Sequence, residues 1–262
     1  MTAPSREIAV LILAAGQGTR MKSDLVKVLH PLAGRPMLHF PLSAAEGLSP
    51  ARLVVVVGRD AEAVQETFRG RAQFVFQAEQ RGTGHAVLQA QAALEGFHGD
   101  VLVFYGDTPL LRAETLERMG VLKAESDADL VVLSGALDVP GIVVRDASGR
   151  LARIVEATDA TPEELAIEER NTGVYLLDKD LLFKSLARIG HDNAQGEIYI
   201  TSIVEVLLSE GRRVEVLRLE DDAEGIGVND RLDLARAAAV LRARKLNQLM
   251  RSGVTIVDPA TT

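Results

Sequence analysis

The sequence predicts an α/β protein with a mostly parallel sheet, helices on both of its faces and a small antiparallel lobe. One observation is a set of short, strongly apolar runs, which are typical of parallel strands buried on both faces. A second is the helical periodicity between several of these runs, because parallel strands need crossover connections. A third is a pair of strand-like runs joined by a single turn, which indicates an antiparallel hairpin.

The expected elements follow one another along the chain. The first apolar run, residues 8–15, closes at Gly16 and is the strongest strand signal. Further strands are expected at residues 52–57, 73–76, 101–105, 128–134 and 214–217. Helices are expected at residues 61–68, 83–94, 112–124, 197–209 and 230–251. Asn229 and Asp230 are both candidates for the last N-cap, and the ending, residues 253–262, contains a strand-like piece.

The hairpin is expected within residues 141–155. Its two strands begin near Ile142 and Leu151, and the segment Asp146-Ala-Ser-Gly149 separates them. Asp, Ser and Gly favour turns because their side chains bond the local backbone or permit unusual backbone angles. This hairpin is the predicted antiparallel lobe over the main sheet.

Composition excludes several classes of protein. The 262 residues contain no cysteine, which rules out disulfides, zinc-thiolate sites and a thiol nucleophile. The net charge of −8 argues against unspecific nucleic-acid binding, so an anionic ligand has to be bound by local groups. The apolar runs are too short for a membrane span and the beginning of the chain lacks a signal-peptide pattern. We therefore expect a cytoplasmic protein that binds neither nucleic acid nor membranes.

The loop after the first strand has the character of a phosphate cradle. Gly16 and Gly18 can bare backbone N–H groups, and Arg20 adds a fixed positive charge. The loop matches neither the Walker A pattern nor Gly-x-Gly-x-x-Gly. On the glycines alone, a tight strand-to-helix turn explains it equally well. Arg20 together with Lys27, one of only six lysines, favours the cradle.

Five groups of residues resemble motifs of the sugar-1-phosphate nucleotidyltransferases. The resemblance is strongest to the N-terminal uridyltransferase domains of bifunctional bacterial uridyltransferase/acetyltransferases, and it extends over nearly the whole chain. The motifs are Leu13-Ala-Ala-Gly-Gln-Gly-Thr-Arg-Met21 with Lys27, Gln77-Ala-Glu-Gln-Arg-Gly-Thr-Gly-His-Ala86, Tyr105-Gly-Asp-Thr-Pro-Leu110, Asn171-Thr-Gly173 with Asn193-Ala-Gln-Gly-Glu197, and Gly227-Val-Asn-Asp-Arg-Leu232. The second motif and Asn-Ala-Gln-Gly-Glu are the most specific to this family.

The resemblance implies a Rossmann-like (GT-A-like) fold and a Mg²⁺-dependent reaction. UTP and N-acetylglucosamine-1-phosphate would give UDP-N-acetylglucosamine, a cell-wall precursor, and pyrophosphate. Two alternatives stay open: a related transferase that uses dTTP or UTP with glucose-1-phosphate, and a nucleotide-sugar-binding module without catalysis.

The resemblance also implies roles for individual residues. Arg20 and Lys27 would neutralise the phosphates, and Asp107 with Asn229 would hold Mg²⁺. The implied substrate-binding residues are Leu13, Ala14, Ala15, Gly16, Gln77, Gly82, Thr83, Tyr105, Gly106, Gly141, Glu156, Asn171 and Thr201. Simpler explanations exist for some of them, namely a strand end at Gln77, a turn at Asp107 and a helix cap at Asn229.

The expected domain organisation also follows the relatives. Residues 1–228 would form the transferase domain with the lobe inserted around residues 135–200, and residues 229–252 a long helix. Residues 253–262 would begin a left-handed β-helix domain, which carries the acetyltransferase activity and the trimer contacts of full-length relatives. No hexapeptide repeat occurs in this chain, so neither property is expected of it. The chain also has a shorter loop than its relatives before Gly141, which bears on sugar selectivity.

Overall fold

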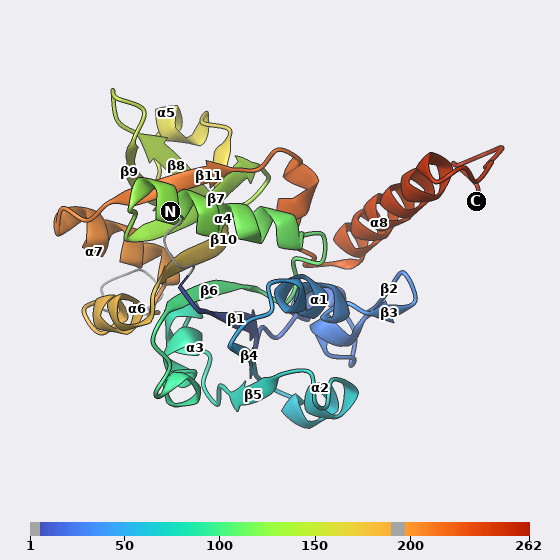
Figure 1. The fold of residues 1–262 in the computed structure, drawn as a ribbon, viewed down its shortest axis with the longest axis horizontal. Coiled ribbons are helices and arrows are strands. Elements are labelled where there is room, and N and C mark those ends of the chain that lie inside the picture. The colour runs from blue at the N-terminus through green and yellow to red at the C-terminus, as the bar shows by residue number, and fades with distance from the viewer. Residues whose placement is uncertain (1–5, 190–196) are drawn as a thin grey trace.

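A computed structural model describes residues 6–189 and 197–262, and its centre is one large twisted sheet (Figure 1). One half of this sheet is parallel. Its strands lie in the order β5-β4-β1-β6 and all point the same way. These strands are β1 (Ile8–Ala14), β4 (Arg52–Val57), β5 (Gln73–Phe76) and β6 (Asp100–Tyr105). The parallel half confirms the predicted sheet, and the bounds of β4 and β5 match the expected ones.

The other half of the sheet contains an antiparallel strand in its middle. This strand, β10 (Glu169–Asp178), runs between β6 and β7 (Leu130–Ala136) and is antiparallel to both. Beyond β7, β11 (Val214–Arg218) is parallel again. Strand β10 is not evident in the sequence, because its first half is polar and Gly173 separates that half from the apolar second half.

The predicted hairpin is present and is joined to β10. Its strands are β8 (Gly141–Arg145) and β9 (Leu151–Glu156), and Asp146 closes the expected turn by accepting the backbone N–H of Ser148. Arg170 pairs with Ile142, so the hairpin branches from the main sheet. A separate small sheet consists of β2 (Pro31–Leu32) and β3 (Arg35–Pro36).

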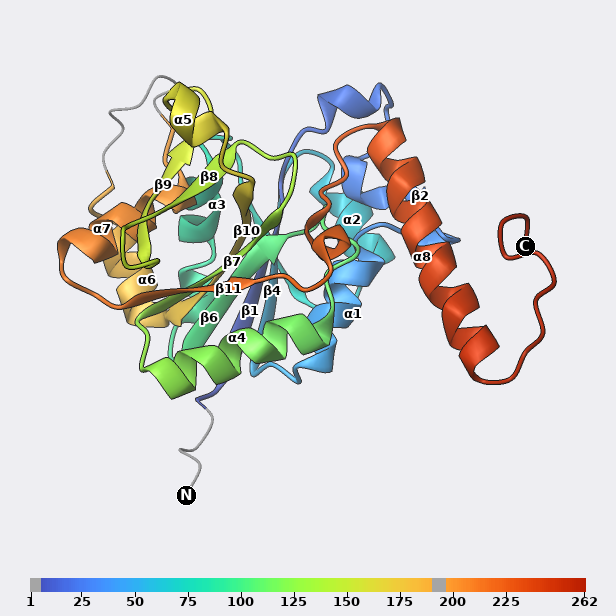
Figure 2. The ribbon, with the colours of Figure 1, turned by 90° about the horizontal axis from the view of Figure 1, so that it is seen from above.

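Helices cover both faces of the main sheet (Figure 2), as predicted. One face packs against α1 (His39–Gly47), α2 (Ala61–Thr67) and α4 (Ala113–Ser126). The other packs against α3 (Thr83–Gln89), α6 (Lys179–Leu186) and α7 (Ile203–Ser209). Strand β1 alternates between the two cores, because successive side chains of a strand point to opposite faces.

The remaining helices lie at the margins of the sheet. Helix α5 (Pro162–Leu165) follows the hairpin, and α8 (Arg231–Arg251) packs beside the small sheet through Ala237. Short 3₁₀ turns complete the described chain: η1 (Thr19–Met21), η2 (Lys27–Leu29), η3 (Ala92–Leu94), η4 (Ile200–Ser202) and η5 (Asp222–Gly225).

Three expected elements need correction. The helix expected over residues 83–94 is divided: α3 ends at Gln89, and the short 3₁₀ helix η3 follows at Ala92–Leu94. The helix expected over residues 197–209 starts as α7 at Ile203, since Ile198 instead bonds the backbone of Arg81 and Gly84. The piece at residues 254–257 is not a strand in the described chain, because no described strand pairs with it.

Candidate active site

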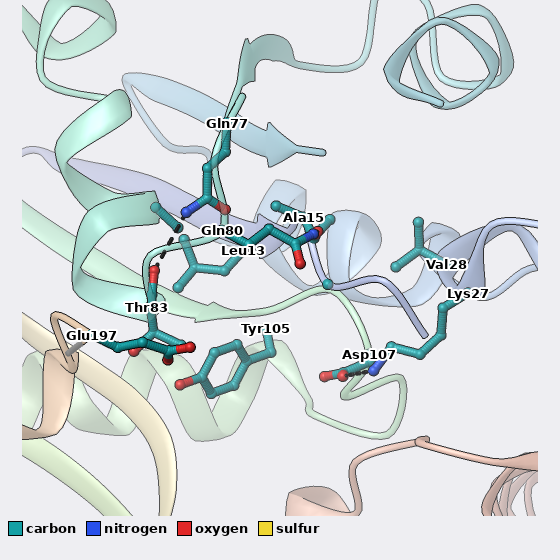
Figure 3. A pocket seen from close by; sticks show the side chains of 14 residues that line it. Leu13, Ala15, Lys27, Val28, Gln77, Gln80, Thr83, Tyr105, Asp107 and Glu197 are labelled. Carbon is teal, nitrogen blue, oxygen red and sulfur yellow. Dashed lines mark hydrogen bonds and ion pairs between the residues drawn. The ribbon is translucent and has the colours of Figure 1, made fainter. Parts of the chain in front are cut away.

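A cleft opens where the parallel strands end (Figure 3). Loops at the carboxyl ends of parallel strands are where open α/β sheets bind ligands. The cleft has a volume of about 330 Å³. Its lining contains the predicted site residues Leu13, Ala14, Ala15, Gly16, Lys27, Gln77, Gly82, Thr83, Tyr105 and Asp107. Ten of the predicted residues therefore lie around one cavity, although they come from separate parts of the sequence.

At one end of the cleft, a cation is held between two oxygen atoms. The Lys27 ammonium forms an ion pair with the Asp107 carboxylate and lies 3.4 Å from Asn229 Oδ1. The Lys27 and Asp107 side chains are only 11% and 22% exposed, so water screens their attraction weakly. Three residues for which the sequence predicts phosphate or metal chemistry thus contact one another across the fold.

Local backbone geometry brings these three side chains together. Gly18 has φ +63°, and a methyl group on it would lie 2.6 Å from Lys27 Cβ, so this position needs glycine. Asp107 follows β6, and its carbonyl oxygen accepts the backbone N–H of Val228 at 2.8 Å. That bond fixes the chain just before Asn229. Asp230, not Asn229, caps α8 by accepting the N–H groups of Leu232 and Asp233, which leaves the Asn229 side chain for Lys27.

The same groups fit a magnesium ion. Mg²⁺ prefers one or two protein oxygens together with phosphates and water, and Asp107 and Asn229 already direct their oxygens at a shared cation, the Lys27 ammonium. The described residues contain no cluster of three or more His, Asp or Glu side chains of the kind that would cage a metal alone. These residues therefore fit a metal that arrives with a phosphate ligand.

The other end of the cleft is formed by the segment from Gln77 to Thr83. Gln77 is 4% exposed, and its side-chain amide nitrogen lies 3.4 Å from the Gly82 carbonyl oxygen and 3.0 Å from His85 Nδ1. Gly82 has φ +99°, and a methyl group there would lie 2.5 Å from the Ile198 carbonyl oxygen. The glycine thus lets the segment before α7 approach closely. The Thr83 hydroxyl accepts the N–H of Ile200 at 3.1 Å and strengthens this contact.

Three of the predicted sugar-site residues converge at the hairpin. Gly141 pairs with Glu156 across β8 and β9, and a methyl group on Gly141 would lie 3.3 Å from the Cβ of Asn171. Burial, and then the charge of Asp159, raise the pKa of Glu156. Tyr105 connects this group to the cleft, since it lines the cleft, and since burial and then the charges of Asp107 and Glu156 raise the pKa of its phenol.

The other predicted residues lie outside the lining. Arg20 is exposed. The backbone N–H groups of Asp233 and Leu232, and after them the charge of Arg20, lower the pKa of Asp230. Gly106 is buried beneath the cleft, where a methyl group would lie 3.0 Å from Ala14 Cβ. Thr201 lies in η4. Residues 193–196 of the Asn-Ala-Gln-Gly-Glu motif lie outside the described residues.

Two polar residues of the cleft were missed as individual site residues. Gln80 donates its side-chain N–H to the Ala15 carbonyl at 2.6 Å and so ties the segment from Gln77 to the glycine loop. Glu197 lines the cleft from the segment before α7. Both belong to family motifs quoted above, and their positions in those motifs could have identified them as site residues.

Comparisons with known proteins show the family of this chain. Residues 10–173 match the family described as MobA-like NTP transferase domain. The chain belongs to this family. The matched range contains the glycine loop, the cleft residues from Gln77 to Asp107 and the first half of β10, up to Gly173.

Several curated relatives are similar over almost the whole chain. "Bifunctional protein GlmU" of Pelobacter propionicus is 48% identical over 260 residues, which is 97% of this chain and 56% of the relative. The proteins of the same name from Geobacter metallireducens and Enterococcus faecalis are 49% and 45% identical, over 98% and 96% of this chain. The chain spans about half the length of the curated relatives it matches. No described helix is both long and apolar enough to cross a membrane.

Proposed function

We propose that this chain transfers a uridylyl group from UTP to N-acetylglucosamine-1-phosphate and releases pyrophosphate. The products would be UDP-N-acetylglucosamine, a cell-wall precursor, and pyrophosphate, made in the cytoplasm. The proposal extends to the domain division, with residues 1–228 as the transferase domain and residues 229–252 as a linking helix. The similarity to proteins named GlmU and the membership of an NTP transferase family support this assignment.

The observation that carries the proposal is the contact of Lys27 with Asp107 and Asn229 beside the cleft. A structural ion pair needs only one acid. Here the ammonium has two oxygen partners, which come from loops 80 and 202 residues away along the chain. The group lies next to glycine backbone at Gly16, where a methyl group would meet no protein atom within 4 Å. Open backbone beside a cationic side chain supports phosphate binding.

The proposed mechanism needs no general base. The attacking group is a phosphate oxygen of N-acetylglucosamine-1-phosphate, which is already an anion. It forms a bond to the α-phosphorus of UTP, while the bond from that phosphorus to the bridging oxygen of pyrophosphate breaks. Catalysis then consists of positioning two polyanions and neutralising their repulsion.

The residues divide this work between them. Lys27, which is buried enough for its charge to act strongly, would neutralise the α-phosphate, and Arg20 would neutralise the departing phosphates. Asp107 and Asn229 would hold Mg²⁺, which would supply positive charge against the repulsion between the two substrates. Gln77 offers both a donor and an acceptor, as the imide edge of uracil requires, and Glu156 and Asn171 would bind sugar hydroxyls or the N-acetyl group.

A pyrophosphate-release assay with and without Mg²⁺ tests the proposal. We expect release with UTP and N-acetylglucosamine-1-phosphate, and loss of release when the metal is chelated. The matched reaction contains dTTP and glucose-1-phosphate. Faster release in this second reaction would replace the proposed substrates with those of a related transferase. Binding of UDP-N-acetylglucosamine without any release would replace the enzyme with a binding module.

A further inference from the structure

Strand β10 is irregular next to the predicted sugar site. Its pairing with β7 shifts between Asn171 and Tyr175. Within the irregular stretch, Gly173 has φ +79°, and a methyl group there would overlap the Tyr105 ring. Only glycine therefore allows the strand and the ring to lie this close. Residues four apart in a strand point to the same face but lie far from each other, and here the irregularity brings the side chains of Asn171 and Tyr175 within hydrogen-bond distance.

The side-chain amide of Asn171 is fixed by two hydrogen bonds. Its Oδ1 accepts the backbone N–H of Gly173 at 3.1 Å, and its Nδ2 donates to the Tyr175 hydroxyl at 2.6 Å. A backbone N–H can only donate, so the atom facing Gly173 has to be the amide oxygen, and this determines which way the amide points. One N–H of the NH₂ group is then left beyond these two bonds.

The Tyr175 hydroxyl is buried, and the hydrogen bond that the structure gives it is the one from Asn171. Tyr175 is 0% exposed and packs in an apolar core, where phenylalanine would fill the same space without burying a polar atom. Burial raises the pKa of Tyr175 well above its usual value, so the phenol stays neutral and cannot act as a base near pH 7. What the hydroxyl provides is an acceptor for Asn171.

We infer that Tyr175 is a positioning residue, which holds the Asn171 amide with one N–H directed at an acceptor oxygen of the sugar phosphate. The inference rests on the proposed function, because it takes Asn171 as a sugar contact. Gly141 supports it from the hairpin side: its Cα lies so close to Asn171 that a methyl group would be 3.6 Å from Nδ2. The amide is therefore confined by β8 on one side and by Tyr175 on the other.

Replacement of the hydroxyl alone tests this role. In Tyr175→Phe we expect the KM for N-acetylglucosamine-1-phosphate to rise roughly five- to tenfold, the effect of losing one neutral hydrogen bond. The KM for UTP and the kcat at saturating sugar phosphate should change little, because Tyr175 is not one of the residues that line the nucleotide cleft. If Tyr175 only stabilised the fold, its replacement would not raise the KM for one substrate alone.

A double-mutant cycle with Asn171→Ala separates positioning from packing. If Tyr175 acts through Asn171, adding Tyr175→Phe to Asn171→Ala should cause no further rise in KM. Additive effects would overturn the inference. Thr172→Val is the matched control for stability: it removes a buried hydroxyl from the same stretch, one that donates to the Leu133 carbonyl at 2.8 Å. We expect this control to lower Tm and to leave the KM for sugar phosphate unchanged.

A measurement that needs no turnover separates the positioning role of Tyr175 from the proposed reaction. Hydrogen exchange of the Asn171 side-chain NH₂, followed by NMR, should speed up at least several-fold in Tyr175→Phe. Unchanged exchange would overturn the positioning role even in an active enzyme. Faster exchange in a protein that releases no pyrophosphate would support the positioning role and reject the proposed reaction.

Discussion

The two parts of the candidate site are built in opposite ways. The nucleotide side, at the ends of β1 and β6, consists of open backbone at Gly16 and of charges that contact one another. The sugar side, around β10, consists of a buried amide that two hydrogen bonds within the protein hold in one orientation, with one N–H left over. One side therefore offers charge to a flexible, highly charged ligand. The other offers a fixed donor to a ligand that has to be recognised by shape.

The difference indicates what each side contributes to function. Charge acts over several ångströms and tolerates small misplacement, whereas a neutral hydrogen bond depends on the exact orientation of both partners. We therefore expect changes on the nucleotide side to alter rate, and changes on the sugar side to alter selectivity and substrate affinity. Three further predictions test this division, from the largest effect to the smallest.

The largest effect is expected at Asp107. Replacement by alanine removes one of the two oxygens that face Lys27 and the predicted metal, so kcat should fall roughly 10²- to 10³-fold. The circular dichroism spectrum should stay unchanged, because the backbone bond from Val228 to the Asp107 carbonyl does not involve the side chain. Pyrophosphate release and Mn²⁺ binding measure the loss.

A second acidic residue serves as the control for Asp107. Asp180 pairs with Lys179 in α6, outside the cleft, and its side chain is 61% exposed. Asp180→Asn removes the same charge, and it should leave both kcat and Mn²⁺ binding unchanged. Wild-type turnover in Asp107→Ala would remove the metal-binding role from this site.

The fold was predicted best where one local pattern decides the structure. The strands β4 and β5 are continuous apolar runs with the expected bounds, and the Asp146 turn is set by its own residues. Strand β10 was missed because its irregular stretch, with Gly173 at its centre, interrupts the apolar pattern. The start of α7 was misplaced because it depends on contacts with residues more than a hundred positions away, such as Thr83.

In the site, too, features set by neighbouring residues could be predicted, whereas contacts between residues far apart in the sequence could not. The glycine loop could be singled out as a candidate from Gly16 and Gly18 together with Arg20 and Lys27, but the contact of Lys27 with Asn229 joins residues that only the fold brings together. The orientation of Asn171 could not be predicted either, since it depends on a hydroxyl and a backbone N–H in an irregular strand. The functions assigned to these residues stay predictions for the assays above.

An intermediate effect is expected from methyl groups added to two glycines. Gly82→Ala should destabilise the fold by about 1–3 kcal/mol, because the added methyl group collides with the Ile198 carbonyl at an unfavourable φ. Gly16→Ala is the matched change, since its methyl group meets no protein atom within 4 Å and points into open space. It should leave Tm unchanged and lower the rate of pyrophosphate release, because the methyl group would occupy space beside the phosphates. Equal effects of both changes on Tm would contradict the open backbone at Gly16.

The smallest expected effect is a pair of Tm shifts of opposite sign, which come from replacing Glu156 and Glu169. Burial, then Asp159, raise the pKa of Glu156, so its charge opposes folding at neutral pH. Burial also raises the pKa of Glu169, but hydrogen bonds from Arg145 and Ser134 outweigh it and leave that pKa below its usual value. The charge of Glu169 therefore stabilises the fold above the pKa of the unfolded chain, and this stability is lost as pH falls through the lowered pKa.

Replacement of each glutamate by glutamine should therefore shift Tm in opposite directions at pH 7. We expect Glu156→Gln to raise Tm by about 1–2 °C, since solvent screens part of the charge, and Glu169→Gln to lower it. The difference at Glu156 should vanish below about pH 4, where glutamate is protonated in the unfolded chain as well, and the difference at Glu169 should disappear only as the pH falls through its lowered pKa. If Glu156→Gln also weakens binding of the sugar phosphate, Glu156 is a residue kept for function at a cost in stability. A lower Tm in both variants would instead mean that the charge of Glu156 stabilises the hairpin. The sugar side would then need another acceptor.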